Sequence, residues 1–360
     1  MVKNIIYIVM KISIKHIAII FVSFFLFSIS CFAQDIHFSQ FDVAPLTINP
    51  ASAGVMEGDF RLSNNYKSQW SSVANVPYTT ISVALDAAIL KQKNDRSYFG
   101  AGLSVYNDRA GKSKMGTTQY NLTVSTIQAL NENNYMSVGL QGGYAQRAVS
   151  YDGLSWDNQF NGDTYDPNLS SGESSLGEKK NYLDVGAGLQ WISNPSEKTE
   201  SKLGVAIFHV NKPNKSFSDN ADKMNMKIVA HWTGNIKLHQ LDHQPDRFFL
   251  PKIVYYRQGP HQELLVGAFI RYMIQGASRY TNYRNQVTVD FGGLYRIGDA
   301  VIASVSFDYG RFKFGVSYDV NVSGLRTAST YRGGLEVALV YSGLFESALI
   351  NVRGIPKAGG

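Results

Sequence analysis

The chain has 360 residues, of which 44% are hydrophobic, 12% aromatic and only 17% charged. Its formal net charge of +6 is not concentrated in a basic stripe, which argues against nucleic-acid binding, and its only cysteine, Cys31, excludes an internal disulfide. The 21 Tyr, 20 Phe and 32 Gly residues favour many short strands, arranged in one large barrel or in two or three smaller domains.

Residues 1–33 have the organisation of a secretory signal peptide. Three lysines precede an uncharged, mainly apolar run over residues 17–29, and a short stretch ending at the small residue Ala33 follows it. The run is shorter than the roughly 20 residues that a transmembrane helix needs. We therefore expect export and cleavage after Ala33. Cleavage would remove Cys31, three lysines and no acidic residue, which lowers the formal charge from +6 to +3.

Two details of this region stay open in the sequence. Translation is compatible with a start at Met1 or at Met10, since a lysine follows Met10 directly. A lipoprotein signal is disfavoured because Ser28 stands where a leucine is expected, three residues before the cysteine.

Residues 34–57 are expected to form a periplasmic segment ahead of the first strand. Within it, Asn49-Pro50-Ala51 has three possible functional roles: a periplasmic plug, a strap inside the barrel predicted below, or a contact for inner machinery. Its simplest role is a turn that begins the first strand. Pro50 fixes its own φ and biases Asn49 toward an extended conformation.

Residues 58–342 repeatedly alternate apolar with polar or small residues. In 182–191, Leu, Val, Ala, Leu and Trp alternate with Tyr, Asp, Gly, Gly and Gln. In 311–320, Phe, Phe, Val, Tyr and Val alternate with Arg, Lys, Gly, Ser and Asp. Successive side chains of a strand point to opposite faces, so each segment predicts a strand with one apolar and one polar face.

A transmembrane barrel explains this pattern better than a soluble β-sandwich. The segments run for about 10–12 residues, enough to cross a tilted bilayer core, whereas sandwich strands are nearer 5–6. Aromatic residues such as Tyr98, Trp191 and Tyr341 lie at strand ends, as in interfacial girdles. Glycine and charge on the polar faces suit a lumen and would not be tolerated in a dry core.

We predict an all-β chain that forms an antiparallel transmembrane barrel of about fourteen strands over residues 58–342, followed by a tail at 343–360. The predicted strands are 58–69, 77–88, 98–108, 118–129, 135–149, 181–192, 201–212, 227–239, 250–258, 260–273, 285–296, 299–308, 311–322 and 333–342. Short links such as 131–134 indicate periplasmic turns, and the polar link 150–180 indicates an extracellular loop or cap. The short–long alternation of links breaks near Gly259-Pro260, so twelve or sixteen strands also fit.

The sequence predicts no enzyme, no catalytic or metal-binding residue and no cofactor. His239 and His243 lack the third ligand of a metal site, and Gly111-Lys112-Ser113 lacks the upstream glycine of a phosphate loop. Gly186-Ala187-Gly188 lies inside a predicted strand, not in a dinucleotide-binding turn. The predicted lumen faces instead carry acidic residues, which suit either a polar channel or ordinary hydration of a barrel interior. These are Asp184, Asp290, Asp308, Asp319 and Glu336.

An ordered set of short motifs resembles the PorP/SprF family, outer-membrane proteins of type IX secretion and gliding machinery in Bacteroidota. The early motifs are Phe38-Ser39-Gln40-Phe41, Asn49-Pro50-Ala51-Ser52-Ala53-Gly54, Tyr66-Lys67-Ser68-Gln69-Trp70, Pro77-Tyr78-Thr79-Thr80 and Asp108-Arg109-Ala110-Gly111. The late motifs are Gly293-Leu294-Tyr295-Arg296, Asp299-Ala300-Val301, Gly315-Val316-Ser317-Tyr318-Asp319 and Gly334-Leu335-Glu336-Val337. The resemblance covers the mature chain except 150–180.

The resemblance implies a barrel in the cell outer membrane that assists export and surface attachment of an adhesin-like secreted protein by binding its C-terminal domain. The implied partners are outer-membrane lipid, that secreted protein and type IX translocon components. The alternative is a porin-like channel for general or hydrophobic solutes. The family-motif positions of interest are Asn49, Pro50, Ala53, Gly54, Tyr66, Trp70, Pro77, Tyr295, Arg296, Ser317, Tyr318, Asp319 and Glu336.

Overall fold

The structure is a computed structural model. It describes residues 35–71, 76–90, 97–150, 154–172, 179–196, 198–217, 222–238, 245–276, 285–324 and 326–344. The predicted signal peptide, the His239 and His243 loop and most of the predicted tail lie outside these residues. Among the helices within them, none is both long enough and apolar enough to cross a membrane.

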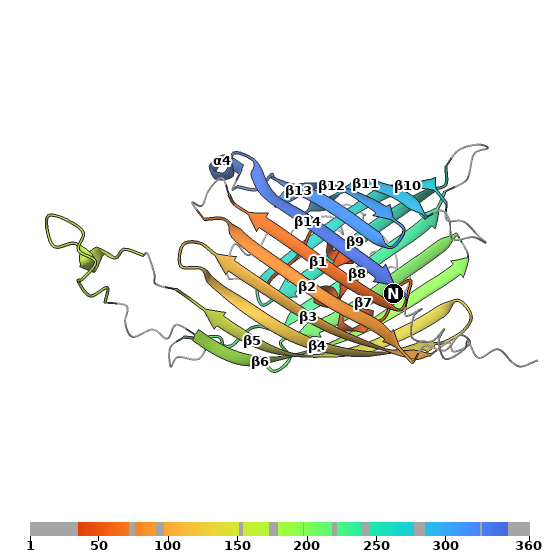
Figure 1. Cartoon of the computed structure of the whole chain (residues 1–360), viewed down its shortest axis with the longest axis horizontal. Coiled ribbons are helices and arrows are strands. Elements are labelled where there is room, and N and C mark those ends of the chain that lie inside the picture. Colours follow the sequence, from red (N-terminus) through yellow and green to blue (C-terminus); the bar gives the residue numbers. More distant parts are fainter. Residues whose placement is uncertain are drawn as a thin grey trace, which may run out of the picture.

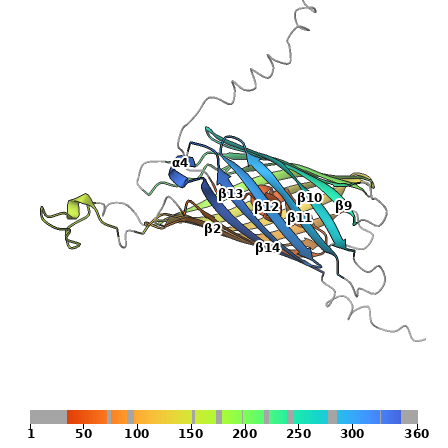
Figure 2. The ribbon, with the colours of Figure 1, turned by 90° about the horizontal axis from the view of Figure 1, so that it is seen from above.

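Fourteen antiparallel strands form a closed barrel, in which each strand pairs with the next and β1 pairs with β14 (Figures 1 and 2). The strands are β1 (Phe60–Gln69), β2 (Tyr78–Ile89), β3 (Tyr98–Ala110), β4 (Met115–Ala129), β5 (Asn134–Ala148), β6 (Lys179–Ser196), β7 (Thr199–Phe208), β8 (Lys227–Lys237), β9 (Arg247–Gln258), β10 (His261–Gln275), β11 (Val287–Arg296), β12 (Ala300–Tyr309), β13 (Phe312–Asn321) and β14 (Arg332–Gly343). All fourteen predicted strands are confirmed, and twelve or sixteen are excluded.

The predicted faces of the strands are confirmed as well. On β13, Phe312, Phe314 and Tyr318 point outward and are about half exposed, whereas Ser317 and Asp319 point into the barrel and are buried. Such an outward apolar face suits a lipid environment. Outward aromatic residues also gather at the strand ends, where the rings of Phe312 and Tyr341 pack at a tilt, as expected of an interfacial girdle.

The barrel has two distinct ends. We call the end where β1 begins and β14 finishes the terminal end, because Phe60 and Gly343 are paired there, and the opposite end the far end. The link 130–133 lies at the terminal end and the long link between β5 and β6 at the far end, so the predicted turn and loop are at opposite ends. The predicted break in the alternation of short and long links is confirmed: the two-residue link Gly259-Pro260 lies at the far end, together with the long link between β5 and β6.

The described part of the link between β5 and β6, residues 154–172, stands clear of the lumen. It contains the short helix η3 (Asp157–Gln159) and projects away from the barrel in Figure 1. A second short helix, α4 (Arg326–Ser329), lies at the same end between β13 and β14.

Residues 35–59 run through the lumen from the far end to the terminal end, and we call them the lumenal strap. The strap contains η1 (Phe41–Val43), α3 (Pro45–Ile48) and η2 (Pro50–Ser52), seen in red inside the barrel in Figure 1. The periplasmic location expected for residues 34–57 is therefore wrong for the described residues, and the strap alternative for Asn49-Pro50-Ala51 is the one observed. The apolar side chains of the strap explain this location, because they are buried only inside the barrel.

One side of the lumen is apolar, contrary to the polar lumen expected from the sequence. Inward side chains of β7 to β12 form a hydrophobic cluster that receives Phe41 and Ile48 of the strap. The wall residues of this cluster are Ala206, Phe208, Val229, Leu250, Val254, Tyr256, Leu265, Phe269, Leu294 and Ile302. The wall and the strap thus share one core.

The close contact between strap and wall yields a stability prediction. A Cβ atom at Gly139 in β5 would come within 2.3 Å of the Pro50 carbonyl carbon and 2.4 Å of the Ala51 nitrogen. Gly139→Ala should therefore lower the free energy of unfolding by about 1–3 kcal/mol, the usual cost of overpacking. Gly142 in the same strand has no neighbour within 4 Å of such an atom.

Gly142→Ala is thus the matched control and should change the free energy of unfolding by less than about 0.5 kcal/mol. Urea unfolding of both variants in detergent, followed by heat-modifiable gel mobility, measures the difference. Equal destabilisation of the two variants would contradict the contact between the strap and β5.

Candidate functional site

The strap and the wall that holds it form the candidate site, and a carboxylate on β14 makes its tightest clamp. The two oxygens of Glu336 accept hydrogen bonds from the backbone nitrogens of Ser39 and Gln40, at 2.7 and 2.8 Å. The Glu336 side chain is almost completely buried. It therefore satisfies two backbone N–H groups that would otherwise be buried without partners.

A buried ion pair on β11 and β13 supports this clamp. Arg296 donates to Asp319 at 2.9 Å and to the Ser39 hydroxyl at 3.0 Å, and that hydroxyl donates to Asp319 at 3.1 Å. Arg296 also reaches Asp299 at 3.0 Å. The pair fixes the strap in place, since each charged group has both an opposite charge and a hydrogen bond to the strap.

Asn49 anchors the middle of the strap. Its backbone is extended, as Pro50 predicts, and its side-chain oxygen accepts from the backbone nitrogen of Ala51 at 2.9 Å. Its amide nitrogen donates to the backbone oxygen of Leu189 at 3.0 Å. A Cβ atom at Gly188 in β6 would lie 1.9 Å from the Asn49 oxygen, so glycine is required where the strap touches this strand.

A carboxylate of β2 binds the end of the strap that lies nearest the terminal end of the barrel. Asp86 accepts a hydrogen bond from the backbone nitrogen of Gly54 at 2.9 Å and two more from Arg61, at 3.0 and 2.8 Å. Arg61 also donates to the backbone oxygen of Ser52 at 3.3 Å. A bidentate pair of this kind is both geometrically specific and charge-assisted.

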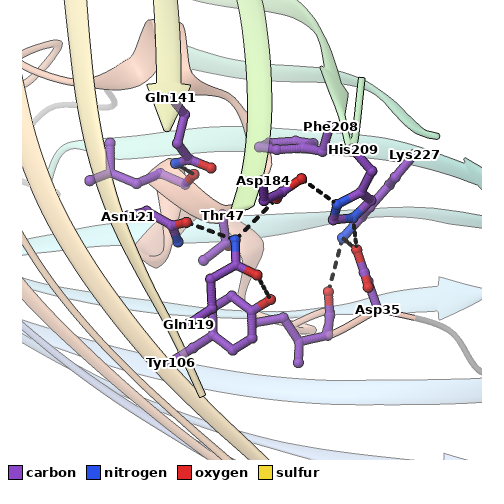
Figure 3. A pocket seen from close by; sticks show the side chains of 12 residues that line it. Asp35, Thr47, Tyr106, Gln119, Asn121, Gln141, Asp184, Phe208, His209 and Lys227 are labelled. Atoms are coloured by element: carbon purple, nitrogen blue, oxygen red, sulfur yellow. Dashed lines mark hydrogen bonds and ion pairs between the residues drawn. The ribbon is translucent and has the colours of Figure 1, made fainter. Parts of the chain in front are cut away.

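The far end of the strap is held by a chain of charged groups, which we call the Asp35 latch (Figure 3). The His209 ring lies between the carboxylates of Asp35 and Asp184, 2.8 Å from the latter. Lys227 donates to the backbone oxygen of Ile36 at 3.1 Å, and its nitrogen lies 3.9 Å from the Asp35 carboxylate. The positive charges of His209 and Lys227 are therefore balanced by the negative charges of two carboxylates, Asp35 and Asp184, at the mouth of the lumen.

The latch shifts the pKa values of both Asp35 and His209 toward their charged forms. Burial alone would lower the pKa of His209, but the Asp35 and Asp184 carboxylates outweigh it and raise this pKa to about 9. Burial alone would raise the pKa of Asp35, but His209 and then Lys227 hold it well below its usual range. Both groups are thus charged at neutral pH.

Two small cavities flank the latch. One is lined by Asp35, Asp184, His209 and Lys227 together with Tyr106 and Gln119, and Figure 3 views it from close by. The other is lined by Asp35, His37, Lys227, Tyr256, Gln258, His261 and Glu263. Within the described residues, no three His, Cys, Asp or Glu side chains gather in a way that could hold a metal ion. The arrangement can hold a peptide segment by hydrogen bonds and charge.

The structure divides the family-motif positions into two groups. Inside the barrel, the strap residues Asn49, Pro50, Ala53 and Gly54 lie against the wall, and Arg296, Ser317, Asp319 and Glu336 are wall residues, all of them buried. Outside the barrel, Tyr66, Trp70, Tyr295 and Tyr318 are exposed, and Pro77 lies half-buried just before β2. Only the inner group forms one site, and the outer aromatic residues lie on the outward surface of the barrel.

The site roles of Asp35, His209 and Lys227 were not predicted from the sequence. Asp35 precedes the first predicted strand, His209 lies inside the predicted strand 201–212 and Lys227 begins the predicted strand 227–239, so no single pattern connects them. By contrast, the lumen positions of Asp184, Asp290, Asp319 and Glu336 were predicted, and all four are buried. Asp308 also points inward but is partly exposed.

Comparisons with known proteins identify the family of this chain. Three solved structures are similar to this chain. The monoaromatic hydrocarbon channel CymD shares 12% identity over 83% of this chain and 92% of its own, with a TM-score of 0.44. A Pseudomonas aeruginosa FadL homologue shares 11% identity (TM-score 0.43) and the P. putida toluene transporter TodX 10% (TM-score 0.40), each over 82% of this chain and 92% of its own. No curated protein matches the chain. A family model described as type IX secretion system membrane protein PorP/SprF matches residues 30–341. The chain therefore belongs to the PorP/SprF family of type IX secretion system membrane proteins.

Proposed function

We propose that this barrel lies in the outer membrane and assists export and surface attachment of an adhesin-like secreted protein by binding its C-terminal domain. The observation that carries the proposal is the lumenal strap, which is hydrogen-bonded to the wall from Asp35 to Gly54. A lumen filled along its length is poorly suited to diffusion. The mouth and the loops are then the surfaces left for a large partner.

The link 154–172 supports a contact at the far end. Gln159 fixes its shape, because the side chain donates to the Leu169 backbone oxygen at 3.1 Å and accepts from the Trp156 backbone nitrogen at 3.1 Å. Phe160, Tyr165 and Leu169 remain exposed on this ordered loop. Exposed apolar side chains on a preformed polar loop are typical of a protein-binding surface.

The alternative is a channel for general or hydrophobic solutes, which the apolar wall of β7 to β12 would favour. In the structure Phe41 and Ile48 already cover that wall. A solute pathway would therefore require the strap to leave the lumen.

Electrical measurements separate these two functions. We expect the purified full-length protein to give no steady ohmic conductance in a planar bilayer, because the strap fills the lumen. Deletion of residues 35–52 should open a conducting pore in those molecules that keep the heat-modifiable gel mobility of a folded barrel. Steady ohmic currents from the full-length protein would instead favour the channel.

Capture of partners from native membranes tests the proposed function directly. A tagged protein, extracted in mild detergent, should elute with one very large secreted protein or with translocon subunits, identified by mass spectrometry. Phe160→Ser combined with Leu169→Ser should reduce the secreted protein in the eluate several-fold, as loss of apolar anchor residues does.

Thr164→Ala, an exposed polar position in the same loop, is the control and should leave the eluate unchanged. Elution of the barrel alone from wild-type membranes would refute the proposal.

A further inference from the structure

In the Asp35 latch, His209 and Lys227 form a site for a carboxylate, and the chain's own Asp35 occupies it. The carboxylate of Asp35 is the strap group that forms a hydrogen bond with His209 among the described residues, and it lies beside Lys227. Residues 35–37 are only half-buried, whereas Phe38, held next to the Glu336 clamp, is fully buried. Besides the Asp35 carboxylate, three backbone groups of these residues bond to the wall: the Asp35 nitrogen donates to Gln258 at 3.1 Å, and the Ile36 and His37 oxygens accept from Lys227 at 3.1 Å and Lys67 at 3.0 Å. Detachment of residues 35–37 would break these bonds while Phe38 and the Glu336 clamp stay in place.

The two cations would keep their positions if Asp35 detached. His209 is still held by Asp184, at 2.8 Å, and Lys227 lies over the rings of Phe208 and Tyr256, at 5.9 and 5.5 Å from their centroids. Two preorganised donors would then face an empty position with one unbalanced positive charge. The chemical group that restores the balance is a carboxylate.

Two unused polar atoms lie beside that position. The Tyr256 hydroxyl and one Glu263 oxygen line the second cavity, are buried, and have no hydrogen-bond partner among the described residues. The Glu263 oxygen lies 3.6 Å from the Arg296 side chain, beyond hydrogen-bonding distance. A hydroxyl and a carboxylate oxygen are the donor and acceptor that a short stretch of peptide backbone needs.

We propose that the far-end mouth binds the free C-terminal carboxylate of an extended polypeptide, and that Asp35 occupies this site until such a chain end displaces it. Lys227 lines both cavities, so detachment of residues 35–37 would join them into one vestibule. The Glu336 clamp limits its depth, so the site accepts only the last few residues of a chain. This inference rests on the proposed function in one respect: the natural occupant would be the C-terminus of the secreted partner.

A fluorescence polarisation experiment on the full-length protein in detergent tests the site without the natural partner. The probe is a fluorescein-labelled peptide, Gly-Ser-Gly-Ser-Ile, with a free C-terminal carboxylate, compared with the same peptide carrying a C-terminal amide. We expect Asp35→Ala to bind the free acid about tenfold more tightly than the wild type does, because the internal competitor is gone. The same variant should prefer the acid to the amide by a similar factor.

Asp42→Ala is the matched control, since Asp42 is another carboxylate of the strap but pairs with Lys252 deeper in the lumen. This variant should bind the acid no better than the wild type. Adding Lys227→Gln or His209→Gln to Asp35→Ala should abolish acid binding, and heat-modifiable mobility identifies the folded variants. Equal binding of acid and amide, or no gain in Asp35→Ala, would overturn the proposal.

Partner capture distinguishes failure of this site from failure of the proposed function. If the free acid binds the Asp35→Ala variant but native membranes yield no secreted partner, the site stands and the proposed function fails. If wild-type and Lys227→Gln proteins capture a secreted partner equally well, the proposed function stands and this site is not where that partner's C-terminus binds.

Discussion

The backbone of a peptide segment buried inside a barrel needs a hydrogen-bond partner for every N–H and C=O group, and this constraint explains the polar part of the lumen. Buried polar groups without partners cost roughly 1–3 kcal/mol each. Here the wall supplies the partners as side chains, from Glu336 at the clamp to Asp86 near the terminal end. Asp86, Asp319 and Glu336 thus act as acceptors for the strap. Asp290 instead pairs with Arg271 and Lys313 of the wall.

The other half of the wall is apolar and buries the hydrophobic side chains of the strap. Phe41 and Ile48 of the strap need an apolar environment, and the inward faces of β7 to β12 provide it. A lumen with one polar and one apolar side holds an amphipathic segment in a single orientation. This division also explains why the strap has little regular secondary structure. The wall supplies apolar contacts for its side chains and hydrogen-bond partners for its backbone, which a helix or sheet would otherwise provide.

The sequence predicted the barrel well and the strap poorly, for physical reasons. A strand in a membrane barrel has one face in lipid and one in the lumen, so its period-two pattern is visible in each segment separately. The strap consists of helical turns of three or four residues and has no period to detect. Gly188 was predicted only as a residue inside a strand, and its contact with Asn49, like that of Gly139 with Pro50, depends on the folded barrel. The Asp35–His209 contact joins residues 174 positions apart.

The direction of the strap couples its burial to closure of the barrel. The chain passes from Asp35 at the far end to Asp59, whose backbone nitrogen donates to Gly343 at the terminal end, and then returns as β1. On its way the strap contacts β5 and β6 through η2 and β14 through Glu336. Pairing β1 with β14 requires closing a loop of nearly the whole chain, which is entropically costly. A strap already bound to early strands and complementary to β14 lowers that cost, so the segment that fills the lumen also favours formation of the seam.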